Sequence, residues 1–246
     1  MNLPDFERKP TRPVTFGEVV VGGGAPVTVQ SMCNTDTRDA ASTIAQIERL
    51  EAAGCEIVRV SVYDADCARA LREIKRRIHI PLVADVHFDY RLAIAALQNG
   101  ADKLRINPGN IGSKAHVQEL VAAAKDVGAP IRIGVNGGSL EKELLRKYGA
   151  PTPEALAESA LGHVVILEEA KFFDIVLSVK ASSTPAMIAA NRILSVQTGY
   201  PLHLGVTEAG LGEEALVKSE VGIGACFQKA SAIPSASPSR ATPCRR

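Results

Sequence analysis

The sequence predicts an α/β protein of the TIM type, a (β/α)8 barrel with an N-terminal β hairpin in front of the first barrel strand. Short apolar runs alternate with longer amphipathic stretches along most of the 246 residues, which is typical of βα units and parallel strands. An open doubly wound sheet would share this alternation, but no GxGxxG motif follows any apolar run. Polar residues also recur at alternate positions late in several runs, where they share one face. We therefore favour the closed barrel.

The first elements expected are those of the hairpin, in VTFGEVVVGGGAPVTVQSM (14–32), where the glycines at 22–24 can take the positive φ angles of tight turns. Two later stretches, ASTIAQIERLEAAG (41–54) and TPEALAESALGHVVILEEAK (152–171), have the apolar spacing of helices that cover a parallel sheet. Seven runs predict barrel strands: VTVQSM (27–32), IVRVSV (57–62), PLVADV (81–86), KLRI (103–106), IRIGVN (131–136), DIVLSV (174–179) and LHLGVT (202–207).

The predicted domain organisation is one substrate-binding barrel at residues 1–225, without its eighth strand. After Ala225 the chain reads CFQKASAIPSASPSRATPCRR (226–246), which is rich in Ser, Ala and Pro and has no periodicity. This stretch interrupts the repeat where an eighth strand is due. We therefore expect residues 226–246 to form an aberrant, disordered tail.

Composition argues against several classes of protein. The formal net charge is +1, from 28 basic and 27 acidic residues, so bulk binding to nucleic acid or to a membrane surface is not indicated. No apolar run reaches the roughly 20 residues of a membrane span, and the start lacks the apolar core of a signal peptide. The 5 cysteines contain no CxxC pair, so neither disulfides nor a metal site built by the chain is predicted. We expect a cytoplasmic protein.

Basic residues late in the strands predict an anion site, because the functional face of a TIM barrel is formed by the carboxyl ends of its strands. The cations expected there are Arg59, Arg105, Arg132 and Lys180. Holding these cations in one cavity costs on the order of several kcal/mol per uncompensated ion, so a ligand must supply negative charge. The ligand is therefore predicted to be rich in phosphate. Arginine forks suit bidentate phosphate contacts, and the glycine-bearing turns at 107–112 and 135–140 can direct N–H groups to the same oxygens.

Other polar residues near the strand ends are expected to transfer protons or to hold neutral parts of the ligand. Asp85, His87 and Glu208 are the catalytic candidates. The further substrate-binding candidates are Asn107, Asn136, Ser178 and His203. Lys180 has an alternative role, since a lysine that ends a barrel strand can form a Schiff base with a carbonyl substrate, as in aldolases. Neighbouring arginines would lower its pKa and favour that role.

A resemblance to a known family is carried by seven segments taken together. They are VQSMCNTDTRD (29–39), EIVRVSV (56–62), PLVADVHFDYRLA (81–93), KLRINPGNIG (103–112), RIGVNGGSLE (132–141), LSVKASS (177–183) and LHLGVTEAG (202–210). In this order they closely resemble the N-terminal part of bacterial 4-hydroxy-3-methylbut-2-enyl diphosphate synthases, the GcpE or IspG family, over about residues 5–225. The resemblance implies a TIM barrel and the reductive opening of 2-C-methyl-D-erythritol 2,4-cyclodiphosphate in non-mevalonate isoprenoid biosynthesis.

The resemblance also implies roles for particular residues. The arginines and lysine that hold the diphosphate in the family correspond to Arg59, Arg105, Arg132 and Lys180, with Asn107 and Asn136 beside them. Glu208 corresponds to a carboxylate placed next to the substrate hydroxyls and the reacting carbon. Cys33 departs from the family motif, which has threonine at this position.

The cofactor and partners implied by the resemblance depend on a second domain. In the family, flavodoxin or ferredoxin supplies two electrons through a [4Fe-4S] cluster, which three cysteines and one glutamate hold in a C-terminal domain. In the family's homodimer that domain closes over the barrel of the partner chain. Neither Cys226 nor Cys244 lies in a cluster motif, so we expect the iron–sulfur domain and its ligands to be absent from this chain.

The unusual tail suggests how such a loss would arise. Read one base earlier, the codons allowed for residues 226–243 can spell LLSEGIGDTIRVSLAGDP, whose IRVSL matches the expected eighth strand and resembles the family's continuation. We therefore hypothesise a frameshift, or a sequencing error, near codon 225. The chain is then interpreted either as the synthase of the family or as an inactive remnant that at most binds the cyclodiphosphate.

Overall fold

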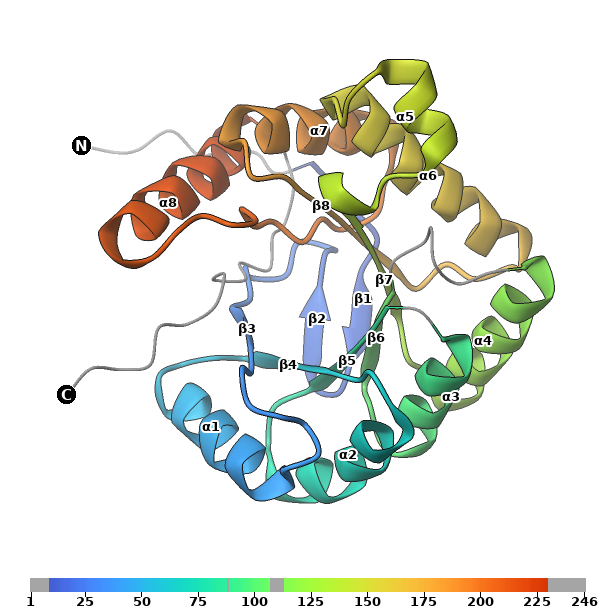
Figure 1. The fold of residues 1–246 in the computed structure, drawn as a ribbon, viewed down its shortest axis with the longest axis vertical. Coiled ribbons are helices and arrows are strands. Elements are labelled where there is room, and N and C mark those ends of the chain that lie inside the picture. Colours follow the sequence, from blue (N-terminus) through green and yellow to red (C-terminus); the bar gives the residue numbers. More distant parts are fainter. Residues whose placement is uncertain (1–8, 88, 107–112, 230–246) are drawn as a thin grey trace.

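The computed structural model describes residues 9–229 except 88 and 107–112, and its centre is a curled parallel sheet of 6 strands in the order β3-β4-β5-β6-β7-β8. Figure 1 shows the sheet curving around an axis, with the helices on its outside. The strands are β3 (Gln30–Met32), β4 (Ile57–Ser61), β5 (Leu82–Val86), β6 (Lys103–Ile106), β7 (Ile131–Asn136) and β8 (Ile175–Lys180). Six of the predicted strands and the TIM-type architecture are therefore confirmed.

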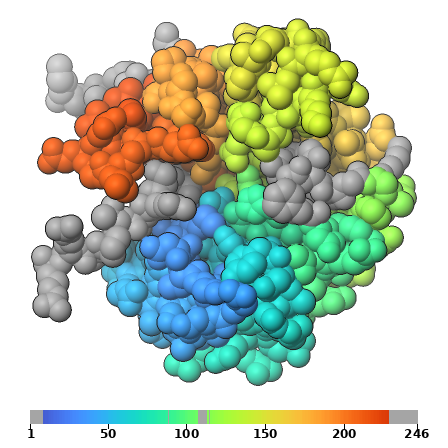
Figure 2. Space-filling model, in the orientation of Figure 1, coloured from blue at the N-terminus to red at the C-terminus, as the bar shows by residue number. Residues whose placement is uncertain are grey.

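The helices surround the sheet in chain order. They are α1 (Ala40–Ala52), α2 (Ala65–Arg77), α3 (Tyr90–Gln98), α4 (Lys114–Val127), α6 (Pro153–Glu169), α7 (Thr184–Gln197) and α8 (Gly212–Lys229), while η2 (Gly137–Ser139) and α5 (Lys142–Tyr148) lie between β7 and α6. Figure 2 shows that the segments coloured blue through green lie side by side on this face of the molecule. Side-chain caps start several of them: Asp39 accepts from Ser42 N–H at 3.0 Å, and Asp64 accepts from Cys67 N–H at 2.8 Å.

Two apolar layers lie on opposite faces of the sheet. On the outer face, residues such as Val58, Leu82 and Leu104 pack against the helices in the main core. On the inner face, Ile57 and Val83 belong to a smaller cluster together with residues of the N-terminal hairpin. This alternation leaves the remaining inward positions, nearer the carboxyl ends of the strands, to polar side chains.

The predicted hairpin is confirmed and closes the end of the barrel at which the strands begin. Strand β1 (Val14–Phe16) pairs antiparallel with β2 (Val19–Val21), and Gly17 in their turn has φ +55°. Figure 1 shows both strands inside the ring of barrel strands. The chain then leaves toward β3 through Gly22, where a Cβ atom would lie 2.1 Å from the carbonyl oxygen of Arg12. Only glycine fits this close backbone approach.

The seventh predicted strand, at residues 202–207, is wrong as an element of the sheet. These residues form one isolated bridge, Leu177 to Leu202, with β8. The N–H of His203 donates to Leu177 O at 2.7 Å and the N–H of Thr207 donates to Ala181 O at 3.2 Å. Because the hydrogen bonding to β8 is interrupted between these two points, the segment runs beside the sheet without forming a continuous ladder.

The expected boundary at Ala225 falls inside a helix. Helix α8 continues to Lys229, and the Cys226 side chain is 0% exposed within it. The expected disordered tail, the missing eighth strand and Cys244 otherwise fall at residues 230–246, outside the described residues. Among the helices that the structure describes, none is long and apolar enough to cross a membrane.

Candidate functional site

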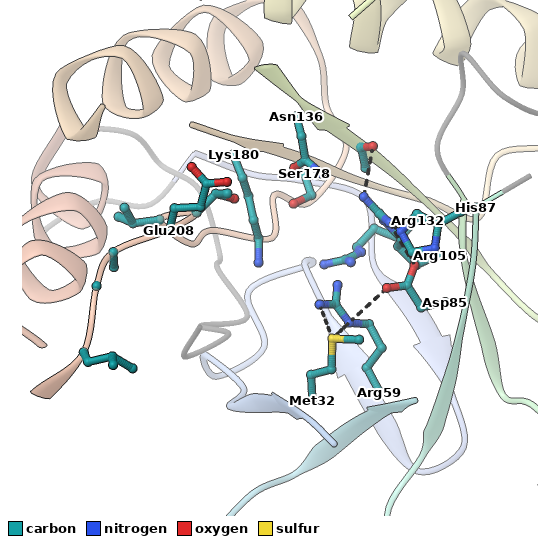
Figure 3. A pocket seen from close by; sticks show the side chains of 16 residues that line it. Met32, Arg59, Asp85, His87, Arg105, Arg132, Asn136, Ser178, Lys180 and Glu208 are labelled. Carbon is teal, nitrogen blue, oxygen red and sulfur yellow. Dashed lines mark hydrogen bonds and ion pairs between the residues drawn. The ribbon is translucent and has the colours of Figure 1, made fainter. Parts of the chain in front are cut away.

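A cavity of about 740 Å³ lies at the carboxyl ends of the barrel strands. Figure 3 shows its side chains pointing inward from β3 to β8 and from the segment that follows residue 205. The cavity brings together nine of the residues proposed from the sequence: Arg59, Asp85, His87, Arg105, Arg132, Asn136, Ser178, Lys180 and Glu208. The alternation of side chains along the strands therefore located most of this wall.

Two of the proposed binding residues, Asn107 and His203, are not placed at the cavity by the described part of the chain. Asn107 and the glycine-bearing turn at 107–112 lie outside the described residues. His203 is 0% exposed and is not part of the cavity wall. Burial first, and then the charges of Arg132 and Lys180, hold the pKa of His203 well below its ordinary value. Substrate contacts by Asn107 and His203 stay predictions.

Strand register explains why the charged side chains meet. Asp85 on β5 is opposite Arg105 on β6, and Arg105 is opposite Arg132 on β7. Nearer the mouth, Asn136 on β7 is opposite Lys180 on β8. Residues in register on neighbouring strands face the same side, so Asp85, Arg105 and Arg132 lie at one level of the barrel wall and Asn136 and Lys180 lie nearer its mouth.

Asp85 is the buried carboxylate that joins two of the arginines. Its Oδ1 accepts from Arg105 Nη1 at 2.9 Å, and its Oδ2 lies 3.6 Å from Arg59 Nε. Burial alone would raise the pKa of Asp85, but the positive charges of Arg59 and Arg105 outweigh it and hold the pKa at about 2. Asp85 is therefore ionised at neutral pH, and its oxygens fix two guanidinium groups.

His87 is held as a neutral acceptor. Arg105 Nη1 lies 2.7 Å from His87 Nε2, and an arginine can only donate, so this nitrogen accepts and the ring proton sits on Nδ1. Burial, followed by the charges of Arg105 and Arg59, lowers the pKa of His87 despite the opposing effect of Asp85. His87 thus helps to orient Arg105.

Positive charge on the cavity wall exceeds the negative charge that faces it. Arg132 is 1% exposed, and its Nε and Nη1 have no hydrogen-bond partner among the described residues. Burial, followed by repulsion from neighbouring arginines, lowers the pKa of both Arg132 and Lys180 well below ordinary values. Donors that are buried without partners cost about 1–3 kcal/mol each, and more when charged, so this wall carries positive charge that the described residues do not compensate.

Three residues that the sequence reasoning missed also shape the site. Met32, at the end of β3, and Gly134, on β7, line the cavity. Lys103 is 0% exposed, and its Nζ lies 3.9 Å from the centre of the Phe16 ring in the hairpin. Lys103 precedes Arg105 by two residues, so the same alternation could have identified it; Met32 and Gly134 carry no charge that would draw notice.

Gly134 leaves room for the Arg105 guanidinium. A Cβ atom at this position would lie 2.5 Å from Arg105 Nε, and the Gly134 carbonyl accepts from Arg105 Nη2 at 3.5 Å. We therefore expect Gly134→Ala to fold but to displace Arg105, which weakens pyrophosphate binding about tenfold by calorimetry, the loss of one charge-assisted hydrogen bond. Gly138→Ala is the matched control, since no atom lies within 4 Å of its added Cβ. Equal effects of the two substitutions would contradict this role.

Glu208 lies at the mouth, between two connected cavities. Its backbone has φ +53°, a left-handed conformation that non-glycine residues rarely adopt away from functional sites. A second cavity of about 870 Å³ shares Glu208, Lys180 and His87 with the first. It extends past the 137–139 turn, and the rest of its lining is uncharged, with hydroxyl side chains such as Ser139, Ser182 and Ser183. The anion pocket therefore opens into a larger, less charged space.

The described residues do not fit an iron–sulfur cluster. No group of three or more His, Cys, Asp or Glu side chains among them could hold a metal ion. The described cysteines are buried free thiols, and burial raises the pKa of Cys33 to about 12 and that of Cys226 to about 11. Thiols that stay protonated are poor metal ligands.

Comparison with known families gives one match over most of the chain. The family described as GcpE TIM-barrel domain matches residues 11–231. The chain is 58% identical over 219 residues to the 4-hydroxy-3-methylbut-2-en-1-yl diphosphate synthase (flavodoxin) of Clostridium perfringens, covering 89% of this chain and 63% of that protein. It is 58% identical over 214 residues to the synthase of the same name from Geobacter sulfurreducens, covering 87% and 61%. The chain thus spans less than two thirds of these relatives.

Solved structures with low sequence identity share the fold. A dihydropteroate synthase from Xanthomonas albilineans superposes with a TM-score of 0.66 at 11% identity, over 92% of each chain. A 3-dehydroquinate dehydratase from Geobacillus kaustophilus superposes with a TM-score of 0.63 at 11% identity, over 94% of this chain and 90% of that one. At this level of identity the likeness concerns the barrel alone.

Proposed function

Because this chain belongs to the GcpE family through that family's TIM-barrel domain, we propose that it binds 2-C-methyl-D-erythritol 2,4-cyclodiphosphate for reductive opening to 4-hydroxy-3-methylbut-2-enyl diphosphate. The single observation that carries this proposal is the excess of cations around the cavity, where Arg132 Nε and Nη1 are buried without a hydrogen-bond partner among the described residues. A cyclic diphosphate supplies the missing negative charge and the oxygen acceptors.

The proposed roles separate binding from proton transfer. Arg59, Arg105, Arg132 and Lys180 bind the diphosphate, with Asn136 and Ser178 beside them. Asp85 has a pKa of about 2 and is therefore a positioning residue for Arg59 and Arg105, not a proton donor at neutral pH. Glu208, which faces both cavities, remains the proton donor of the proposal.

The proposed source of electrons is inferred from the longer relatives. The names of the two relatives include the word flavodoxin in parentheses. We therefore propose flavodoxin as the electron donor, with ferredoxin as the alternative. A [4Fe-4S] cluster would supply single electrons in the family. Since the described residues do not fit such a cluster, we assign it no ligand here and derive no step through it. The cytoplasmic location and the family's homodimer also remain part of the proposal.

A Schiff-base role for Lys180 is set aside in favour of this function. Burial and the nearby arginines do lower the pKa of Lys180, which would suit either role. The family match favours phosphate binding. The lining of the cavity favours it as well, because Lys180 shares its wall with three arginines whose charge a carbonyl substrate alone would leave uncompensated.

The proposal is tested in two measurements on the same preparation. Calorimetry with the cyclodiphosphate is expected to show one-to-one binding that Lys180→Met weakens. Anaerobic reconstitution with iron and sulfide, followed by iron analysis and turnover with reduced flavodoxin, then tests the reductive step. A chain that fails to bind the cyclodiphosphate contradicts the substrate. Binding without iron uptake or turnover would restrict the function of this chain to substrate binding.

A further inference from the structure

We propose that Met32 is a site of reversible oxidation by hydrogen peroxide, and that its sulfoxide weakens anion binding in the cavity by accepting hydrogen bonds from Arg59. The inference rests on the anion-binding part of the proposed function and concerns its regulation. Met32 is the last residue of β3, lines the cavity and is half-buried. Small oxidants that enter the cavity can therefore reach its sulfur.

The sulfur of Met32 already lies against a phosphate-binding group. Arg59 Nη2 is 2.7 Å from Met32 Sδ, and Arg59 Nε is 3.2 Å from the same atom. Figure 3 shows the thioether and the guanidinium facing each other in the wall of the cavity. Strand register fixes this pair, since Met32 on β3 is opposite Arg59 on β4. A thioether is a weak acceptor, so the guanidinium stays available to a stronger one.

Oxidation replaces that weak acceptor with a strong one. A sulfur lone pair attacks one peroxide oxygen, the O–O bond breaks, an S–O bond forms, and the remaining oxygen leaves as water after proton transfer. The sulfur loses two electrons and the peroxide gains them. The sulfoxide oxygen is polar and accepts strongly, so it competes with phosphate oxygens for Arg59 and also fills space beside it.

Among the residues that the structure describes, the other oxidisable side chains are less favoured. Met187 is 0% exposed within α7. Burial raises the pKa of the Cys55 and Cys67 thiols as it does for Cys33, and peroxide reacts with thiolates. Met32 is therefore the residue that peroxide can reach and whose sulfoxide would alter anion binding by the neighbouring Arg59.

The test is peroxide treatment of the purified chain, followed by peptide mass spectrometry and pyrophosphate calorimetry. We expect Met32 to gain one oxygen before Met187, added pyrophosphate to slow that gain, and the oxidised chain to bind pyrophosphate at least about tenfold more weakly, consistent with the loss of one charge-assisted hydrogen bond. Methionine sulfoxide reductase is expected to restore affinity. Met32→Leu is the matched control, which should bind pyrophosphate and keep its affinity after peroxide.

The proposal is overturned if Met187 is oxidised as fast as Met32, or if the affinity for pyrophosphate is unchanged once Met32 carries the oxygen. An equal loss of affinity in Met32→Leu would do so as well, because the damage would then lie elsewhere. The untreated chain reports on the anion site by itself. A failure of the proposed function is thus seen before peroxide is added, and a failure of the Met32 proposal is seen after it.

Discussion

Replacing Arg132 with methionine is expected to weaken pyrophosphate binding by about 10- to 100-fold while leaving the folded state as stable as before or more stable. The side chain is 1% exposed, and its Nε and Nη1 have no protein partner among the described residues. The ligand-free fold therefore holds a charge that the protein only partly compensates. Methionine fills a similar volume without that cost, so we expect the free energy of unfolding to rise by about 1 kcal/mol or more.

Arg105→Met is the matched control for this prediction. Arg105 also lines the cavity, but its Nη1 donates to Asp85 at 2.9 Å, so the substitution removes a hydrogen-bonded ion pair. We expect it to weaken binding and to lower stability together, because Asp85 is left with the longer contact to Arg59. Calorimetric titration and thermal unfolding of both variants separate the two cases. Equal destabilisation by both substitutions would contradict the view that the charge of Arg132 is uncompensated until an anion binds.

Asp85→Asn is expected to produce the largest loss of stability, about 3–5 kcal/mol, because it leaves the buried Arg105 and the half-buried Arg59 without their carboxylate. Asp85 is 2% exposed and contacts both Arg59 and Arg105. Urea unfolding measures the effect directly. Glu214→Gln is the control: it removes an exposed i,i+4 ion pair with Lys218, and such pairs contribute little, so its unfolding curve should lie close to that of the parent chain.

The acid side of the stability curve gives an independent check on Asp85. Its pKa is lowered from 3.8 to about 2 in the folded protein, so the folded state binds this proton more weakly than the unfolded state does. The stabilisation is therefore complete above the unfolded pKa and is lost as the pH falls from about 4 to about 2, by roughly 2 kcal/mol. The difference in stability between the parent and Asp85→Asn should shrink over this range. A constant difference would contradict the low pKa.

The periodicity of the sequence was sufficient to predict the architecture, because the spacing of apolar residues indicates whether one or both faces of a strand are buried. It identified six barrel strands and the N-terminal hairpin, and it failed for residues 202–207. That segment has the composition of a strand. Whether it joins the sheet depends on the hydrogen bonds a neighbour offers along its length, which are not encoded locally.

Alternation also predicted that Arg59, Arg105, Arg132 and Lys180 share one face, and the seven motifs indicated the family. These four side chains line one cavity, and their binding of a phosphate-rich anion there stays a prediction. Only the tertiary structure decided what each side chain does there. It showed that Asp85 is fixed between arginines, that Gly134 makes room for Arg105 and that Met32 touches Arg59. The reason is physical: spacing along a strand fixes which way a side chain points. Its protonation, contacts and counter-charges depend on atoms that only the closed barrel brings within reach.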